Sequence, residues 1–177
     1  MVPEKFYSLL ILFLSLEMVS DINELFEPFK AEINIEKKEY YSNQTISQGL
    51  ISFQDNKFVY QLNDPMNQTI YGLKDQLIVQ DNDFKQVMIY NNNYNFLLSK
   101  VFDKELTYTP ISCPEMCFKA IINDESIKTS TVTAVNNKLA SMQIVDNQNQ
   151  VFLIKFSNLV YELSLIHISE PTRLWHI

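Results

Sequence analysis

The chain has 177 residues, of which 46% are hydrophobic and 20% charged, and its 14 basic and 21 acidic residues give a net charge of −7. This composition is typical of one globular domain, and the absence of a basic tract argues against nucleic-acid binding. The two glycines, Gly49 and Gly72, lie far apart, which excludes the glycine-rich phosphate loops of nucleotide-binding enzymes.

The scarcest residue types are confined to the C-terminal end. His167, Arg173, Trp175 and His176 are the only His, Arg and Trp residues of the chain. The remainder has no imidazole for a catalytic triad, a zinc site or acid–base chemistry near neutral pH. We therefore expect a protein that is not an enzyme, with no catalytic residue, no metal site and no cofactor.

The first twenty residues have the pattern of an export signal. Lys5 supplies a minimal positive region, and Phe6–Leu16 is an apolar run of suitable length. This run is shorter than the ~20 residues that span a bilayer. A cleaved signal peptide over residues 1–20 is therefore favoured over the alternatives, a membrane anchor or a buried helix.

A short helix and a strand open the body of the chain. Asp21 and Glu24 have the spacing of a capping box, so Asp21–Glu27 is predicted to be a helix, and Pro28 ends it. Phe29–Glu36 then alternates apolar and polar residues without a break. This alternation predicts a half-buried strand.

Further short apolar segments follow, separated by clusters of Asn, Asp, Gln and Pro. The predicted strands are Gly49–Phe53, Phe58–Leu62, Thr69–Tyr71, Gln76–Val79, Lys85–Tyr90, Glu105–Thr109, Phe118–Ile122, Lys128–Val135, Leu139–Val145 and Val151–Phe156. One segment differs, because Tyr94, Leu97, Leu98, Val101 and Phe102 recur at helical spacing and share one helix face. The predicted fold class is mainly β: one large antiparallel sheet with one or two short helices.

Cys113 and Cys117 are the two cysteines of the chain. In an exported protein, a pair with this spacing favours a disulfide over two free thiols, and a metal or redox role is a third alternative. Pro114 suits a tight loop between them, because it disfavours a helix at the residue before it.

The run Asp81-Asn82-Asp83 has the acidic spacing that begins a calcium-binding loop. It lacks the glycine and the final glutamate of that loop. A solvated turn is therefore the favoured interpretation.

The final residues differ in composition from the rest. Leu163–Arg173, LSLIHISEPTR, resembles the translation of a sequencing-library adapter. We expect the natural protein to run only to about Glu162, with a genuine unusual tail as the alternative. The predicted organisation is a signal peptide over residues 1–20, one domain over 21–162 and an artefactual tail over 163–177.

Several segments of the body follow one another in an informative order. They are the alternating strand that begins at Phe29, then Ser47–Phe53, Lys57–Tyr60, Pro65–Ile70, Leu77–Val87, and the paired strands from Met142 to Asn158. In order and spacing they resemble the periplasmic outer-membrane lipoprotein carrier family, LolA. The resemblance implies an incomplete, curved antiparallel β-barrel under short covering helices.

The resemblance also implies a function. Members of this family hold the acyl chains of lipoproteins in an apolar cavity and carry them across the periplasm to the outer membrane. An inner-membrane lipoprotein-releasing ABC transporter loads the carrier, and an outer-membrane acceptor unloads it. We therefore expect a periplasmic monomer whose partners are acylated lipoproteins, that transporter and that acceptor.

The chain departs from the family pattern at two places. The family has an Arg-Pro pair before the Lys57–Phe58 segment, and its arginine helps to tie the helical cover to the barrel, whereas this chain has Gln54–Asn56 there. The closing C-terminal strand of the family is also missing, since the unusual tail begins where that strand should come. Its absence is expected to leave an unpaired sheet edge.

The resemblance assigns candidate ligand-binding residues to a hydrophobic cavity. Its walls are expected to be Phe53, Phe58, Tyr60, Leu62, Leu77 and Val79, and its movable cover Tyr94, Leu97, Leu98, Val101 and Phe102. Taken singly, each of these residues is also accounted for as ordinary core. Two other functions stay open: a different exported lipid-binding module, such as the acceptor-type LolB-like relative, and an exported enzyme, which the lack of a nucleophile–base pair disfavours.

Overall fold

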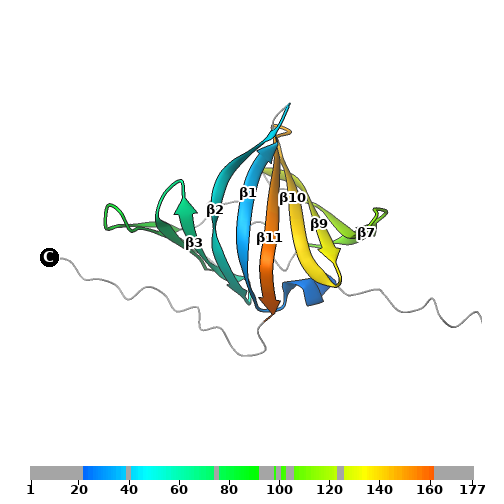
Figure 1. The fold of residues 1–177 in the computed structure, drawn as a ribbon, viewed down its shortest axis with the longest axis horizontal. Helices are drawn as coiled ribbons and strands as arrows, with labels where there is room; N and C mark the ends of the chain where they lie inside the picture. Colours follow the sequence, from blue (N-terminus) through cyan, green and yellow to red (C-terminus); the bar gives the residue numbers. More distant parts are fainter. Residues whose placement is uncertain are drawn as a thin grey trace, which may run out of the picture.

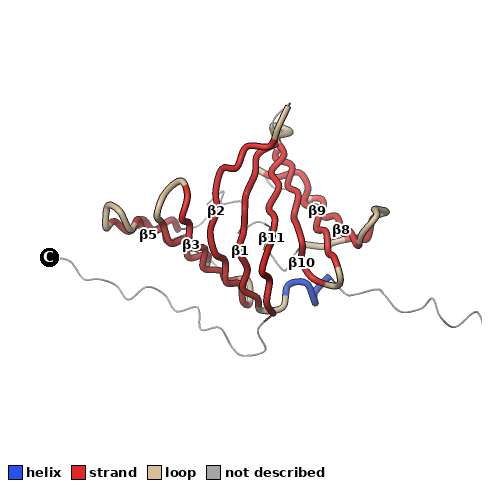
Figure 2. Tube along the Cα trace, in the orientation of Figure 1, coloured by secondary structure: helices blue, strands red, loops and turns tan. Residues whose placement is uncertain are grey.

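The computed structural model describes residues 22–38, 41–73, 76–91, 98, 101–102, 106–122 and 126–161. Within them, eleven strands form a single antiparallel sheet, and a 3₁₀ helix precedes the first strand (Figures 1 and 2). The elements are η1 (Ile22–Phe26), β1 (Phe29–Lys38), β2 (Asn43–Gln54), β3 (Lys57–Asp64), β4 (Gln68–Gly72), β5 (Gln76–Asp81), β6 (Gln86–Asn91), β7 (Thr109–Ile111), β8 (Met116–Ile121), β9 (Ile127–Val135), β10 (Lys138–Asp146) and β11 (Val151–Tyr161). The expected fold class, an open curved antiparallel sheet, is confirmed.

The strand order is β6-β5-β4-β3-β2-β1-β11-β10-β9-β8-β7. Two meanders, β1 to β6 and β7 to β11, are joined because the first strand pairs with the last. The absence of a closing strand is expected to leave an unpaired sheet edge. Within the described residues the sheet is open, its edges are β6 and β7, and β11 lies between β1 and β10.

The sheet forms an arch, and its apolar core lies on the concave side. Figure 1 shows the long central strands, with the outer strands bending away to both sides. The alternation in β1 explains which face is apolar, since Phe29, Ala31, Ile33 and Ile35 are buried. The register places buried apolar residues of the neighbouring strands beside them, which gives one continuous apolar face. Burial of each large apolar side chain contributes about 1.5–3 kcal/mol.

Most predicted strands match the observed ones within a few residues. The strand β2 begins earlier than predicted, at Asn43, β11 continues further than predicted, to Tyr161, and the prediction near Tyr108 is wrong. The sequence predicts a strand over Glu105–Thr109, but the strand β7 begins only at Thr109, and Leu106 to Tyr108 are irregular. Leu106 and Tyr108 pack against the core while Thr107 is exposed. Buried and exposed side chains therefore alternate as the sequence predicts. The segment that carries them packs against the core without pairing as a strand.

Tight hairpins form here without glycine. Asp55 and Asn56 between β2 and β3 have φ of 50° and 62°, and Asn136 and Asn137 between β9 and β10 have φ of 52° and 58°. Two successive positive φ angles characterise the type I′ turn, and Asn and Asp are the non-glycine residues that adopt it most readily. At these two turns, Asn and Asp thus occupy the positions that glycine often takes in type I′ turns.

A polar cluster joins the first and last strands. The Lys155 Nζ donates to Glu36 Oε1 at 2.6 Å, and the Asn43 Nδ2 donates to Glu36 Oε2 at 3.0 Å. These two hydrogen bonds, that of Lys155 first, hold the pKa of Glu36 below its usual range. The ion pair therefore stabilises the pairing of β1 with β11 only while Glu36 is ionised.

Glu36→Gln is expected to weaken the acid sensitivity of the fold. A carboxyl whose pKa is lower in the folded state stabilises the protein above its unfolded-state pKa, and this contribution is lost as the pH falls through the folded-state pKa. Urea unfolding between about pH 5 and pH 3 should show a smaller fall in the free energy of unfolding for the variant than for the wild type. Lys155→Met should give the same flattening, and an unchanged slope in both variants would contradict the role of the pair.

Candidate binding site on the concave face

The six expected wall residues share the concave face of the sheet. Phe53 of β2 lies opposite Phe58 of β3, and Leu77 of β5 continues the same row beyond Gly72. Tyr60 and Val79 lie in the next row, on either side of Ile70. Leu62 lies one row further along β3, and all six wall residues are buried.

The two glycines of the chain make room for the rings of this wall. A Cβ on Gly72 would lie 2.0 Å from the Phe58 ring. A Cβ on Gly49 would lie 2.0 Å from the Gln61 carbonyl oxygen and 2.8 Å from the Tyr60 ring. Gly72 lies directly across from Phe58 in the pairing of β3 with β4. The rings therefore lie flat over neighbouring strands, at positions where no other residue type fits.

The described residues of the expected cover lie against the concave face of the sheet. Leu98 and Val101 are helical, the Phe102 N–H donates to the Leu98 carbonyl oxygen at 3.2 Å, and all three side chains are buried in the core cluster. Tyr94 and Leu97, the other two expected cover residues, lie outside the described residues. The structure thus brings the described part of the cover against the wall.

Phe102 lies at the centre of an aromatic cluster. Its ring centroid is 4.8 Å from that of Phe53, 6.3 Å from Phe58, and 6.1 Å from both Phe26 and Phe29. Aromatic pairs at such distances stabilise by about 0.5–1.5 kcal/mol beyond the area that they bury. Phe102 therefore joins the cover to η1 and to three strands at once.

Tyr108 connects the cover to the sheet through its hydroxyl group. The phenol oxygen is 3.3 Å from the Val101 carbonyl oxygen and 3.2 Å from the Ser130 Oγ of β9. Burial raises the pKa of Tyr108 to about 12, against the opposing hydrogen bond to Ser130. The phenol therefore stays protonated near neutral pH and can donate to the Val101 carbonyl while it shares a hydrogen bond with Ser130.

An open pocket of about 370 Å³ lies at the seam between the cover and η1. Its lining consists of Ile22, Asn23, Phe26, Glu27, Pro28, Asp55, Val101, Phe102, Leu106 and Tyr108. It includes two of the expected cover residues and none of the six wall residues. Among the described residues, Leu98, Val101 and Phe102 pack against the wall, and this pocket lies beside the cover.

Sequence reasoning missed Phe26, Leu106 and Tyr108 as site residues. The sequence assigns Phe26 only to a short helix and the alternation of Leu106 and Tyr108 to a strand. Leu106 and Tyr108 follow the cover closely in the chain, which is a signal for their role, whereas Phe26 lies far from the cover in sequence and has no such signal. The Asp55 turn, which replaces the Arg-Pro pair of the resembled family, contributes one residue to the pocket.

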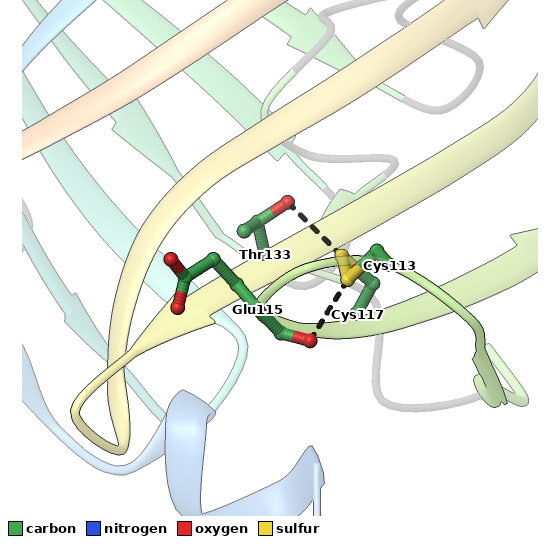
Figure 3. The surroundings of a disulfide bond; sticks show 4 residues. All are labelled: Cys113, Glu115, Cys117 and Thr133. Atoms are coloured by element: carbon green, nitrogen blue, oxygen red, sulfur yellow. Dashed lines mark hydrogen bonds between the residues drawn. A yellow bond between two sulfur atoms is a disulfide. The ribbon is translucent and has the colours of Figure 1, made fainter.

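The cysteine pair is joined in a disulfide at the opposite end of the sheet from β6. Figure 3 shows the Cys113–Cys117 bond in the connection that enters β8, with Thr133 of β9 beside it. The Cys113 Sγ lies 2.9 Å from the Glu115 carbonyl oxygen, and the Cys117 Sγ lies 3.7 Å from the Thr133 Oγ1. The bond thus closes a short loop next to the edge strand β7.

Removal of this disulfide is expected to lower the free energy of unfolding by about 2 kcal/mol, because closing so short a loop restricts the unfolded chain only modestly. The double variant Cys113→Ser/Cys117→Ser should show this loss in urea unfolding, and addition of reductant to the wild type should reproduce it. Reductant should leave the double variant unchanged. A wild type that reductant does not destabilise would contradict the assignment.

The Asp81 turn is closed by its own hydrogen bonds. The Asp81 Oδ1 accepts from the backbone N–H groups of Asp83 and Phe84, and its Oδ2 accepts from Gln68. These bonds, that of Phe84 first, hold the pKa of Asp81 below its usual range. Across the described ranges, no group of three or more His, Cys, Asp or Glu side chains is placed to hold a metal ion.

Comparison with known proteins gives only distant likenesses. No family model and no curated protein matches the chain. Similar solved structures include an uncharacterised conserved protein from Thermus thermophilus, with a TM-score of 0.49, 9% identity, and coverage of 79% of this chain and 82% of that one. A DUF1329 family protein from Desulfovibrio piger has a TM-score of 0.49, 8% identity, and coverage of 82% and 90%. A LolA superfamily protein from Nitrosomonas europaea has a TM-score of 0.44, 9% identity, and coverage of 82% and 94%.

The described helices are short. None of them is long and apolar enough to cross a membrane.

Proposed function

We propose that the protein is an exported lipid-binding module that holds lipoprotein acyl chains on the concave face of its sheet and carries them across the periplasm. The observation that carries the proposal is the relation between the wall and the cover. An open sheet presents a continuous apolar face, and a short helical segment covers that face with Leu98, Val101 and Phe102. An apolar face under an apolar cover supports the binding of an apolar ligand.

The cover competes with the ligand for the apolar face of the sheet. Each CH₂ group moved from water to an apolar site contributes about 0.8 kcal/mol, so a long acyl chain can replace the buried side chains of the cover. The binding free energy is then the difference between ligand burial and cover burial. A carrier needs this small difference, because it must give up its cargo to an acceptor.

The seam pocket is the proposed point of entry. It is open to solvent, and Phe102 and Val101 form part of its lining, so the end of an acyl chain can reach the cover from outside. Loading by an inner-membrane ABC transporter and unloading by an outer-membrane acceptor remain part of the proposal, in line with the sequence resemblance.

Acylated lipoproteins are expected to co-purify with the protein. The full chain should be produced with its N-terminal segment in a Gram-negative host, isolated from the periplasm under mild conditions, and analysed for bound species by native mass spectrometry. Val79→Asp, which places a charge in the wall on β5, should lose the bound species, whereas Val135→Asp on an exposed position of β9 should retain them. Recovery of phospholipids or free fatty acids alone would favour a general lipid-binding module, and recovery of no lipid would reject the proposal.

A further inference from the structure

The edge strand β6 is apolar and exposed on both of its faces. All six of its residues are exposed, and Val87 and Ile89 retain 53% and 55% of their accessible surface. Met88 and Tyr90 lie opposite Val79 and Leu77 of β5, so they extend the concave face. Val87 and Ile89 alternate with them and therefore lie on the convex face. Sheet edges of this kind pair readily with another strand.

The opposite edge strand, β7, has features that prevent pairing with another strand, whereas β6 has none of them. β7 has only three residues, contains Pro110, and is followed by the disulfide loop. Proline, short length and charge are the usual devices that prevent edge pairing. Between Gln86 and Asn91 there is no proline and no charged residue, and the pairing with β5 has no register shift.

The properties of β6 restrict the strand that can pair with it. Such a strand must be uncharged and must present apolar side chains to both faces of the extended sheet. Within the described part of the chain, β6 itself has these properties and remains exposed. A two-fold axis perpendicular to the sheet would place two β6 strands antiparallel, with both concave faces on the same side.

This arrangement also avoids electrostatic repulsion. The chain has a net charge of −7, which opposes most contacts between two copies. The β6 strand brings no carboxylate to the contact, and the nearest charge along the chain is Lys85, at one end of the strand. In an antiparallel pair the Lys85 end of one copy lies beside the Asn91 end of the other, so the two lysines stay apart.

We propose that two copies of the protein associate through antiparallel pairing of their β6 strands, which joins the two sheets into one. The occupant of the edge is thus a second copy of the chain rather than a peptide of another protein. This proposal goes beyond the proposed function and does not depend on it, and it replaces the expectation of a monomer that the sequence resemblance implied.

Sedimentation equilibrium of the ligand-free protein over a wide concentration range tests this proposal. The wild type is expected to show a monomer–dimer equilibrium. Ile89→Lys, which places like charges near the two-fold axis, is expected to weaken dimerisation at least tenfold. Ile121→Lys, at a 76% exposed position of the inner strand β8, is the matched control and should dimerise like the wild type.

Far-UV circular dichroism should confirm that both variants keep the sheet. A wild type that remains monomeric at all concentrations would overturn the proposal, as would an Ile89→Lys variant that dimerises normally. Equal loss of dimer in both lysine variants would show that added positive charge in general, rather than the β6 edge, controls association, and would overturn it too.

Discussion

Tyr108→Phe is expected to increase the apparent affinity for acyl chains about tenfold. The substitution removes the hydroxyl group that contacts both the Val101 carbonyl oxygen and Ser130. Loss of a buried hydrogen bond with a partner left unsatisfied costs about 1–3 kcal/mol, and this cost falls on the closed state of the cover. If ligand must displace the cover, weakening the closed state by about 1.4 kcal/mol increases apparent affinity about tenfold.

The matched control is Tyr161→Phe. Tyr161 packs against the core outside the wall and the cover, burial raises its pKa, and its hydroxyl group accepts from the Leu139 N–H and donates to the Leu25 carbonyl oxygen. This variant should lower the free energy of unfolding by a similar amount without increasing ligand affinity. Fluorescence titration with a labelled acyl probe measures both variants. Equal affinities in the two variants would contradict the role of Tyr108 in holding the cover.

Phe102→Ala is expected to lower the free energy of unfolding by about 3–5 kcal/mol, the usual cost of truncating a buried phenylalanine. The residue lies in the middle of a ring cluster that includes Phe53, Phe29 and Phe26. The space that it vacates adjoins both the wall and the seam pocket. We therefore expect this variant to bind acyl probes more tightly while it unfolds at a lower urea concentration.

Phe84→Ala provides the comparison, since Phe84 is 75% exposed in the turn between β5 and β6. Its free energy of unfolding should change by no more than about 0.5 kcal/mol, and its affinity for the probe should not change. Urea unfolding and probe titration on the same samples separate the two effects. A Phe102→Ala variant that loses stability without gaining affinity would identify Phe102 as a core residue only.

Local patterns in the sequence were sufficient to predict most of the strands. The alternation of Phe29–Glu36 correctly predicts β1, and the helical spacing of Leu98, Val101 and Phe102 correctly separates the cover from the strands around it. Both patterns reflect burial on one face, which short sequence windows record directly. Tyr108 shows the limit, because an alternating segment can pack against the core without pairing as a strand.

The arrangement of the strands and the position of the pocket could not be obtained in this way. The pairing of β1 with β11 joins residues more than a hundred positions apart, such as Glu36 and Lys155. The seam pocket likewise combines Phe26, Asp55 and Tyr108, which local sequence patterns do not connect. Such contacts depend on register and curvature, which are properties of the whole sheet.

We expect the cover to leave the apolar face when an acyl chain binds there. The most direct test is a titration of the purified protein with a fluorescent peptide that carries an N-terminal acylated cysteine, alongside the same peptide without acyl chains. We predict saturable binding of the acylated peptide, no binding of the other, and tighter binding to Tyr108→Phe than to Tyr161→Phe. Equal binding of the two peptides, or no binding of either, would contradict the account.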